Sequence, residues 1–195
     1  MTDKKMDSNN FFKVLDKYDT NKIEIEDKGL EKYINLETKN IYLGGKYSNK
    51  MFAKSKIPVT ERLINNIMRT AKYNGKKIKA YKIVRDAFEI IDKKTKKNPL
   101  QILIYALQNA APKEETTRLR FGGISVPKAV DVAPQRRLDI AIRNIAQGAV
   151  KASHKNKKRM ENCLAEEIIR ASKNEVESFS ISKKNDVERV AKSAR

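Results

Sequence analysis

The spacing of apolar residues changes between residues 115 and 132, and this change constrains the fold more than any other feature. On both sides of Gly122-Gly123 polar and apolar residues alternate, whereas the flanking segments place apolar residues three and four positions apart. Alternation around a Gly-Gly pair predicts a β-hairpin with a two-residue turn. Two strands alone are marginal in water, so we expect the hairpin to project and to lean on a partner. Pro127 lacks a backbone donor, which predicts a bulge or an early end to strand pairing.

Helical periodicity accounts for most of the remaining chain. Asn98-Pro99 is typical of a helix N-terminus, and residues 100–111 behind it are apolar on nearly all sides, so we expect a central, buried helix there. The segment Phe179–Ile181 is predicted to be extended. Five further helices are expected. One begins just after Pro58, one includes residues 83–91, two cover residues 134–153 and 160–171, and one covers part of 183–195.

These patterns predict a mainly α fold: a bundle of about six helices with a protruding two-stranded β-hairpin and an extended basic N-terminal arm. A chain of 195 residues suits one domain with a modest core. We expect residues 1–22 to form a polar N-terminal extension. Residues 23–195 then form a single domain that includes the basic arm at 44–57 and the β-ribbon at 115–132.

The position of the charge indicates the class of partner. The chain has 43 Lys and Arg residues against 24 Asp and Glu, a net charge of +19, yet residues 1–45 are almost neutral. The densest basic stretch, 46–85, contains Glu61 as its only acid, and a second cluster covers 151–159. Such clusters repel one another unless a polyanion neutralises them, so nucleic acid is the leading partner. A solvated basic surface and binding to an anionic membrane remain alternatives.

The residues needed for catalysis or metal binding are scarce. One cysteine, Cys163, and one histidine, His154, exclude a disulfide framework and a Cys-based zinc site. Glu166 and Glu167 are adjacent on a predicted helix surface and do not indicate an acid–base dyad. We therefore expect a protein that is not an enzyme, with no cofactor and no metal.

The termini and hydropathy suggest a soluble, intracellular protein. No apolar run approaches eighteen residues, and the N-terminus has no hydrophobic signal region. The glycine–lysine segments Gly44-Gly45-Lys46 and Gly75-Lys76-Lys77 lack the spacing of a phosphate-binding loop. Binding to nucleic acid is therefore expected to rely on distributed cations rather than on one loop motif.

Several strings in the second half of the chain are specific when taken together and in order. They are Asn98-Pro99-Leu100-Gln101, Asn109-Ala110-Ala111-Pro112, Thr116-Thr117-Arg118, Gly122-Gly123, Ala129-Val130-Asp131-Val132 and Pro134-Gln135-Arg136-Arg137. Further strings are Pro58 to Asn65, Asn74 to Lys77, Leu164 to Glu167, Ala191 to Arg195 and the stretch Ile23 to Leu36. With them the chain resembles the universal small-subunit ribosomal protein seven family, in its archaeal and eukaryotic branch. The eukaryotic member of that branch is also called small-subunit protein five.

The resemblance implies a function. It implies a structural constituent of the small ribosomal subunit that binds the 3′ major domain of small-subunit rRNA and organises assembly of the head. It also implies a position near the mRNA exit channel and the tRNA exit site, beside neighbouring head and platform proteins, in the cytoplasm (with assembly in the nucleolus if eukaryotic) and not as a homo-oligomer. A free basic RNA- or DNA-binding regulatory protein is the alternative.

The candidate site residues follow from the charge clusters and from the resemblance. Arg118 and Arg120 share one face of a strand, together with Gly122, Gly123 and Lys128 on a ribbon expected to face mRNA and tRNA. The candidate rRNA-binding residues are Lys46, Lys50, Lys54, Lys56, Arg62, Arg69, Lys76, Lys77, Arg136, Arg137, Arg143, Lys155, Lys157 and Lys158.

Overall fold

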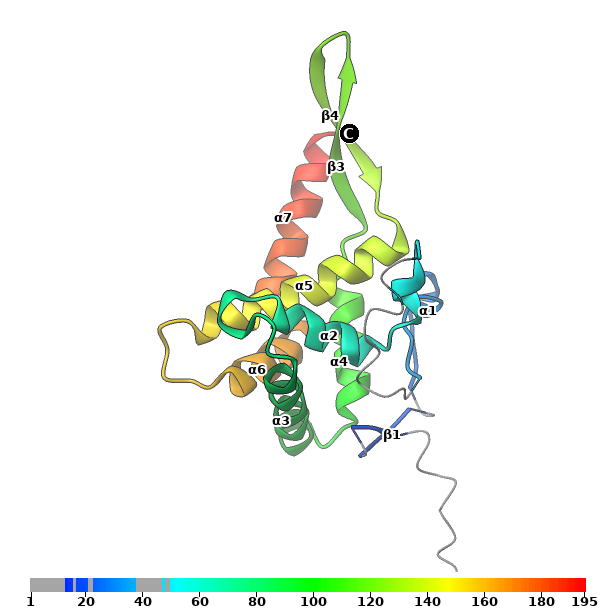
Figure 1. The fold of residues 1–195 in the computed structure, drawn as a ribbon. Helices are drawn as coiled ribbons and strands as arrows, with labels where there is room; N and C mark the ends of the chain where they lie inside the picture. The colour runs from blue at the N-terminus through cyan, green and yellow to red at the C-terminus, as the bar shows by residue number, and fades with distance from the viewer. Residues whose placement is uncertain (1–12, 16, 21–22, 38–46, 48–49) are drawn as a thin grey trace, which may run out of the picture.

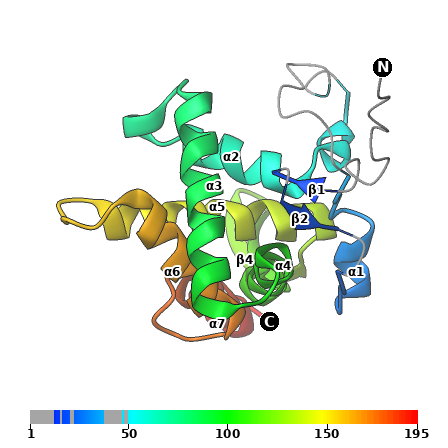
Figure 2. The same cartoon turned by 90° about the horizontal axis from the view of Figure 1, so that it is seen from below.

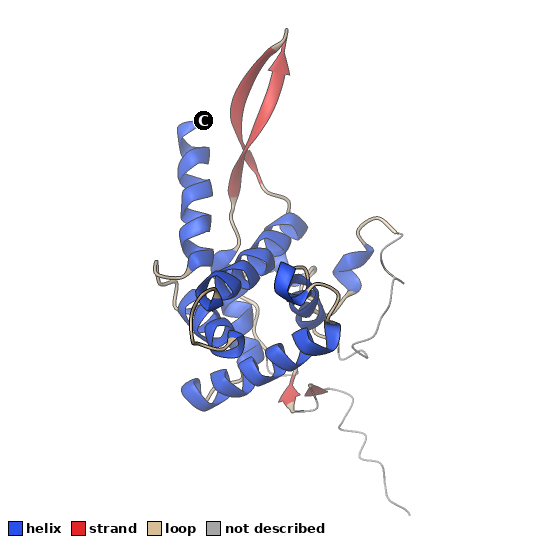
Figure 3. Cartoon of the chain, turned by 60° about the vertical axis from the view of Figure 1, so that its left-hand side comes forward, coloured by secondary structure: helices blue, strands red, loops and turns tan. Residues whose placement is uncertain are grey.

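The computed structural model describes the protein over residues 13–15, 17–20, 23–37, 47 and 50–195. Within these residues a long β-hairpin stands out from one end of a helical body (Figure 1). Figure 3 shows the same division by colour, with the ribbon in red and the helices in blue. The predicted fold class, a helical bundle with a protruding hairpin, is confirmed. Of the predicted arm, residues 44–46 and 48–49 lie outside the described residues.

Long helices build the body, and shorter elements surround it. The long helices are α2 (Val59–Met68), α3 (Lys77–Thr95), α4 (Pro99–Ala110), α5 (Pro134–Ser153), α6 (Met160–Ser172) and α7 (Phe179–Ser193). The hairpin consists of β3 (Glu114–Phe121) and β4 (Ile124–Asp131). The shorter elements are β1 (Lys13–Val14), β2 (Tyr18–Asp19), α1 (Lys28–Glu31) and two 3-10 turns, η2 (Ala53–Lys56) and η3 (Ala71–Tyr73).

Helix α4 lies at the centre of the core, as its apolar character predicted. The Asn98 side chain accepts a hydrogen bond from the Leu100 N–H at 3.0 Å, and Pro99 occupies the first turn, where no backbone donor is needed. Ile104 and Leu107 are fully buried, and the helix contacts α5 and α6. Figure 2 views this helix nearly end-on, inside the other elements.

Helix α7 begins earlier than the sequence suggested. Phe179–Ile181 is helical, so the prediction of an extended segment is wrong. The Ser178 side chain caps the helix, and the buried Glu167 carboxylate of α6 accepts hydrogen bonds from the Ser178 hydroxyl at 2.8 Å and the Ser180 N–H at 2.9 Å. A carboxylate at a helix N-terminus satisfies donors that have no partner within the helix. Glu167 is therefore a buried capping group rather than the surface carboxylate that was expected.

Gly148 permits the close approach of three helices at this point. A Cβ atom added to Gly148 would lie 2.9 Å from the Glu167 carboxyl group and 3.0 Å from the Phe179 Cβ. Real Cβ atoms essentially never come closer than 3.0 Å to another heavy atom. A glycine in the middle of α5 thus allows the capping carboxylate of α6 and the start of α7 to pack against it.

The hairpin is regular along its whole length. Pairing runs from Glu114 opposite Asp131 to Phe121 opposite Ile124, and the turn residues Gly122 and Gly123 adopt the positive φ that a tight hairpin turn requires. Pro127 pairs with Arg118 without a bulge or an early end, so that prediction is wrong. A two-stranded ribbon has only edge strands, and such a strand accommodates proline where its missing N–H would face solvent.

The end of the chain supports the base of the ribbon. Helix α7 runs beside the lower part of β3 (Figure 1), and the Ala129 N–H donates to the Ala194 carbonyl at 3.1 Å. Arg195 forms an ion pair with Glu114. The ribbon therefore leans on its own C-terminal helix at the base.

Part of the predicted N-terminal extension packs onto the body. Strand β1 pairs with β2, and Val14 and Tyr18 are buried. The Tyr18 ring meets the Phe88 ring of α3 edge-on, with ring centroids 6.1 Å apart. These residues join the same hydrophobic core as the helices.

Candidate nucleic-acid interface

The described part of the basic arm is fixed to the body at several points. Lys54, in η2, forms an ion pair with Asp139 of α5, and the Asn35 side chain donates to the Lys56 carbonyl at 2.8 Å. The turn that carries residues 50–57, cyan in Figure 1, accordingly lies beside the first half of α5. Lys50 and Lys56 are exposed and make no ion pair within the described residues. Lys46 lies outside the described residues.

Arg62 occupies a structural position. Its side chain is only 6% exposed, and its guanidinium donates to Asp139 at 2.6 Å. Although burial raises the pKa of Asp139, hydrogen bonds from Lys54 and Arg62 hold that pKa below its ordinary value. Arg62 therefore joins α2 to α5, and its charge is neutralised inside the protein rather than presented to a phosphate.

The adjacent residues Arg136 and Arg137 have different environments. Arg137 is 12% exposed, pairs with Asp27 at 2.8 Å and donates to the Pro112 carbonyl at 3.2 Å. Arg136 is 61% exposed and forms a two-point contact with Glu115 of the ribbon, at 2.7 and 3.0 Å. This contact raises the pKa of Arg136 above its usual value. Arg136 can reach a solvent-side partner, whereas Arg137 cannot.

The exposed cations of the arm and of α5 form one surface. Positions 136 and 143 are seven residues apart and so lie on the same side of the helix, which is also the side of Asp139 that receives the arm. Arg143 is exposed and, among the described residues, unpaired. We call this set the arm–α5 surface; it comprises Lys50, Lys54, Lys56, Arg136 and Arg143.

A second basic surface lies at the far end of α5 from the ribbon. Both views place the loop after α2 and the loop at 154–159 at this end (Figures 1 and 2). Lys158 pairs with Glu166 at 3.2 Å, whereas Lys77 is partly buried in an ion pair with the buried Glu61. The exposed candidates here, which we call the end surface, are Arg69, Lys76, Lys155, Lys157 and Lys158.

The two faces of the ribbon differ in chemistry. Residues that pair across a hairpin share a face. Arg118 pairs with Pro127 and Arg120 with Ser125, so both arginines are exposed on one face. Lys128 pairs with Thr117 and therefore projects from the opposite face. The structure brings the two arginines together and separates them from the lysine.

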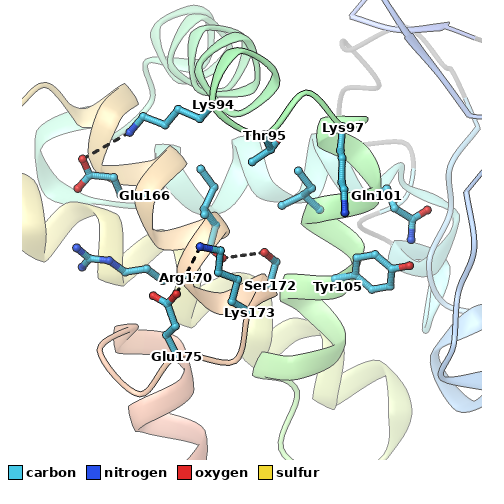
Figure 4. Close-up of a pocket in the computed structure, with 12 residues that line it drawn as sticks. Lys94, Thr95, Lys97, Gln101, Tyr105, Glu166, Arg170, Ser172, Lys173 and Glu175 are labelled. Atoms are coloured by element: carbon cyan, nitrogen blue, oxygen red, sulfur yellow. Dashed lines mark hydrogen bonds and ion pairs between the residues drawn. The ribbon is translucent and has the colours of Figure 1, made fainter.

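A hollow that the sequence did not indicate lies between the end of α3, α4 and α6. It has a volume of about 690 Å³ (Figure 4). Lys94 faces Glu166 at 3.8 Å and Lys173 faces Glu175 at 3.6 Å, so cations and carboxylates partly cancel there. Its mixed charge makes it less suited to a polyanion than the arm–α5 and end surfaces.

The sequence also did not indicate which acidic residues pair with the buried arginines Arg62 and Arg137. Asp139 lies 77 residues from Arg62, and Asp27 lies 110 residues from Arg137. No local spacing rule connects residues so far apart. Among the described residues, no group of three or more His, Cys, Asp or Glu side chains could hold a metal ion, and none of the described helices combines the length and apolar character needed to cross a membrane.

Comparison with known proteins gives a consistent result. A family model described as ribosomal protein S7p/S5e matches residues 12–195. The chain is 57% identical to small ribosomal subunit protein uS7 of Thermoplasma volcanium, over 93% of this chain and 100% of that protein. It is 55% identical to the Archaeoglobus fulgidus protein of the same name, over 93% of this chain and 94% of the relative. The Picrophilus torridus relative is 54% identical, over 93% of this chain and 98% of its own length.

Proposed function

The chain belongs to the ribosomal protein S7p/S5e family, and from that premise we propose that it binds the 3′ major domain of small-subunit rRNA and organises assembly of the head. As a member of this family, the chain is a non-enzymatic structural protein of the small ribosomal subunit, with a role in translation. Its partners are therefore rRNA and other ribosomal proteins. We further propose that it works in the cytoplasm beside head and platform proteins.

The observation that carries the proposal is the arrangement of unpaired cations. Lys50, Lys56 and Arg143 come from two separate segments, yet the ion pair between Lys54 and Asp139 holds these segments together. A folded RNA presents phosphates on several strands, and cations spread over a broad rigid surface match that distribution. A duplex-DNA reader would instead present one exposed helix to a groove.

The proposed contacts are a subset of the sequence candidates. Arg62, Lys77 and Arg137 are left out because carboxylates of the protein bind their head groups and their side chains are largely buried. Lys54, Arg136 and Lys158 also have carboxylate partners, but they are kept because more than half of each side chain is exposed. Lys46 is kept on the basis of sequence alone. The proposed rRNA-binding residues are thus Lys46, the arm–α5 surface and the end surface.

Salt-dependent binding tests this proposal. Replacing Lys50, Lys56 and Arg143 with Ala should reduce the slope of log affinity against log salt by about two to three units, because each phosphate-bound cation contributes nearly one. The matched control replaces Lys93, Lys96 and Lys97, three exposed lysines at and just after the C-terminal end of α3. If both triple variants lose the same slope, the arm–α5 surface has no special role. The readout is binding of the full chain to a 3′ major-domain transcript.

We also propose that the arginine face of the ribbon, Arg118 and Arg120, faces mRNA in the exit channel and tRNA in the exit site. Both side chains are exposed, on a ribbon that contacts α7 and Arg136 of α5 near its base. A photo-crosslinker placed at position 120 in reconstituted subunits should attach to mRNA or to exit-site tRNA. Attachment to rRNA alone would contradict this part of the proposal.

A further inference from the structure

Two large apolar side chains are exposed in the middle of the basic arm. Met51 is 85% exposed and Phe52 is 68% exposed. The structure describes the side chains of three phenylalanines. Phe88 is fully buried and Phe179 is partly buried, whereas Phe52 is exposed. Adjacent exposed residues of this size often mark a binding site.

The backbone at Phe52 is in an unusual conformation. Its φ is 59° and its ψ is 0°, in the left-handed region that side chains other than Gly, Asn and Asp rarely adopt. A bulky aromatic residue at such a position costs folding free energy, and glycine would fit the backbone better. Strain of this kind, when observed, points to a functional constraint on the side chain.

The turn that displays Phe52 is nevertheless firmly held. The Phe52 carbonyl accepts hydrogen bonds from the Ser55 N–H at 3.1 Å and the Ser55 hydroxyl at 2.8 Å. The next residue, Ala53, is buried, and Lys54 binds Asp139 of α5. The aromatic ring therefore projects from a fixed backbone, which lowers the entropy cost of using it in binding.

The surrounding charge selects the class of partner. Exposed Lys50 and Lys56 flank the pair, and no carboxylate occurs in the sequence between residues 46 and 60. An apolar protein partner would leave Lys50 and Lys56 unbalanced, because neither has an ion-pair partner among the described residues. A nucleic acid satisfies both features, because phosphates pair with the lysines while a base stacks on the ring.

We infer that Phe52, with Met51 beside it, forms a stacking platform for an unpaired base of the bound RNA. This inference rests on the proposed function and adds a specific contact to it. Lysines supply attraction that any RNA strand can use, whereas a fixed aromatic ring requires a base that is free to unstack. The platform therefore favours a loop or a bulge over a continuous duplex.

A single-tryptophan variant provides the most direct test. The chain contains no tryptophan, so Phe52→Trp introduces one fluorophore at the platform. We expect its emission to be strongly quenched when the full chain binds a 3′ major-domain transcript, because a stacked base lies against the indole. Val176→Trp, at an exposed apolar position in the loop before α7, is the matched control and should change little. An unquenched tryptophan at position 52 in a saturated complex would overturn the inference.

Affinity measurements separate this inference from the proposed function. Phe52→Ala should weaken binding to the transcript about 5- to 100-fold. The salt slope should stay unchanged, because no cation is lost. Phe52→Tyr should retain most of the affinity, and Val176→Ala should have no effect. The wild-type chain could prefer the transcript over an unrelated RNA while Phe52→Ala binds the transcript as tightly as the wild type does. In that case the stacking inference fails and the proposed function stands. If the wild type shows no preference, the proposed function fails first.

Fold integrity is checked in the same series. The Phe52 ring is largely exposed, so Phe52→Ala and Phe52→Gly should melt no lower than the wild type, and Phe52→Gly should bind as weakly as Phe52→Ala. A clear loss of stability in both variants would mean that the ring serves the fold, which would overturn the inference.

Discussion

Replacing Arg137 with Ala should destabilise the protein, whereas the same change at Arg136 should not. Hydrogen bonds to charged groups contribute about 1.5–3 kcal/mol, and breaking a buried pair costs about 3–5 kcal/mol. Arg137 is 12% exposed, but its partner Asp27 is 30% exposed, so water can replace part of the lost contact. We therefore expect Arg137→Ala to lower the free energy of unfolding by about 2–3 kcal/mol. For a chain of this size that is a decrease of about 4–12 °C in Tm.

Arg136→Ala is the matched control, one residue away. Its side chain is 61% exposed, and an exposed ion pair contributes less than about 1 kcal/mol. The assay is thermal and urea unfolding of the full chain, followed by circular dichroism. Equal loss of stability in the two variants, or a Tm for Arg137→Ala within 2 °C of the wild type by this scale, would refute the reasoning that separates them.

Three further predictions follow from contacts in the body. Gly148→Ala should lower the free energy of unfolding by about 1–3 kcal/mol, because the new methyl group would overlap the Glu167 carboxyl group; an unchanged melting curve would show that the helices can move apart. Glu167→Gln should cost about 1–2 kcal/mol, because the amide nitrogen cannot accept from the Phe179 N–H, which faces Oε2, and the negative charge at the start of α7 is lost. It should also speed amide exchange at the start of α7, and unchanged exchange there would argue against the cap. The pKa of Asp139 is lowered in the folded state, so its contribution to stability is fully present above pH about 4, near its unfolded-state pKa, and is lost as the pH falls through the lower folded value. Urea midpoints measured from pH 7 to about pH 2.5 should therefore fall less steeply in Asp139→Asn, and parallel curves would contradict the assignment.

The elements that could be predicted from sequence are those with a strong local signal. The hairpin turn needs two residues with positive φ, and Gly122-Gly123 supplies them within an alternating pattern. The cap at Asn98 and the apolar surface behind it indicate a buried helix without reference to the rest of the chain. In contrast, the start of α7 depends on Glu167, a residue of another helix, and the local sequence Phe179–Ile181 does not carry that information.

The candidate interface was predictable only as a region of positive charge. The distribution of Lys and Arg along the chain locates the basic stretches. It cannot separate exposed cations from those neutralised in the interior. Arg136 and Arg137 are identical in sequence terms, and their roles differ because Asp27 lies next to only one of them in the fold. Likewise, the exposure of Phe52 follows from a left-handed turn that sequence patterns for helices and strands do not describe.

Competition between two RNAs of equal length tests the central claim most directly. The full chain is titrated with a 3′ major-domain transcript and with an unrelated RNA while the salt concentration is raised through the physiological range. If the broad cationic surface and the platform recognise a folded site, the preference for the 3′ major domain should persist as the salt increases. Equal affinities that fall together with salt would mean that only unspecific charge attraction operates, and they would contradict the proposed rRNA site.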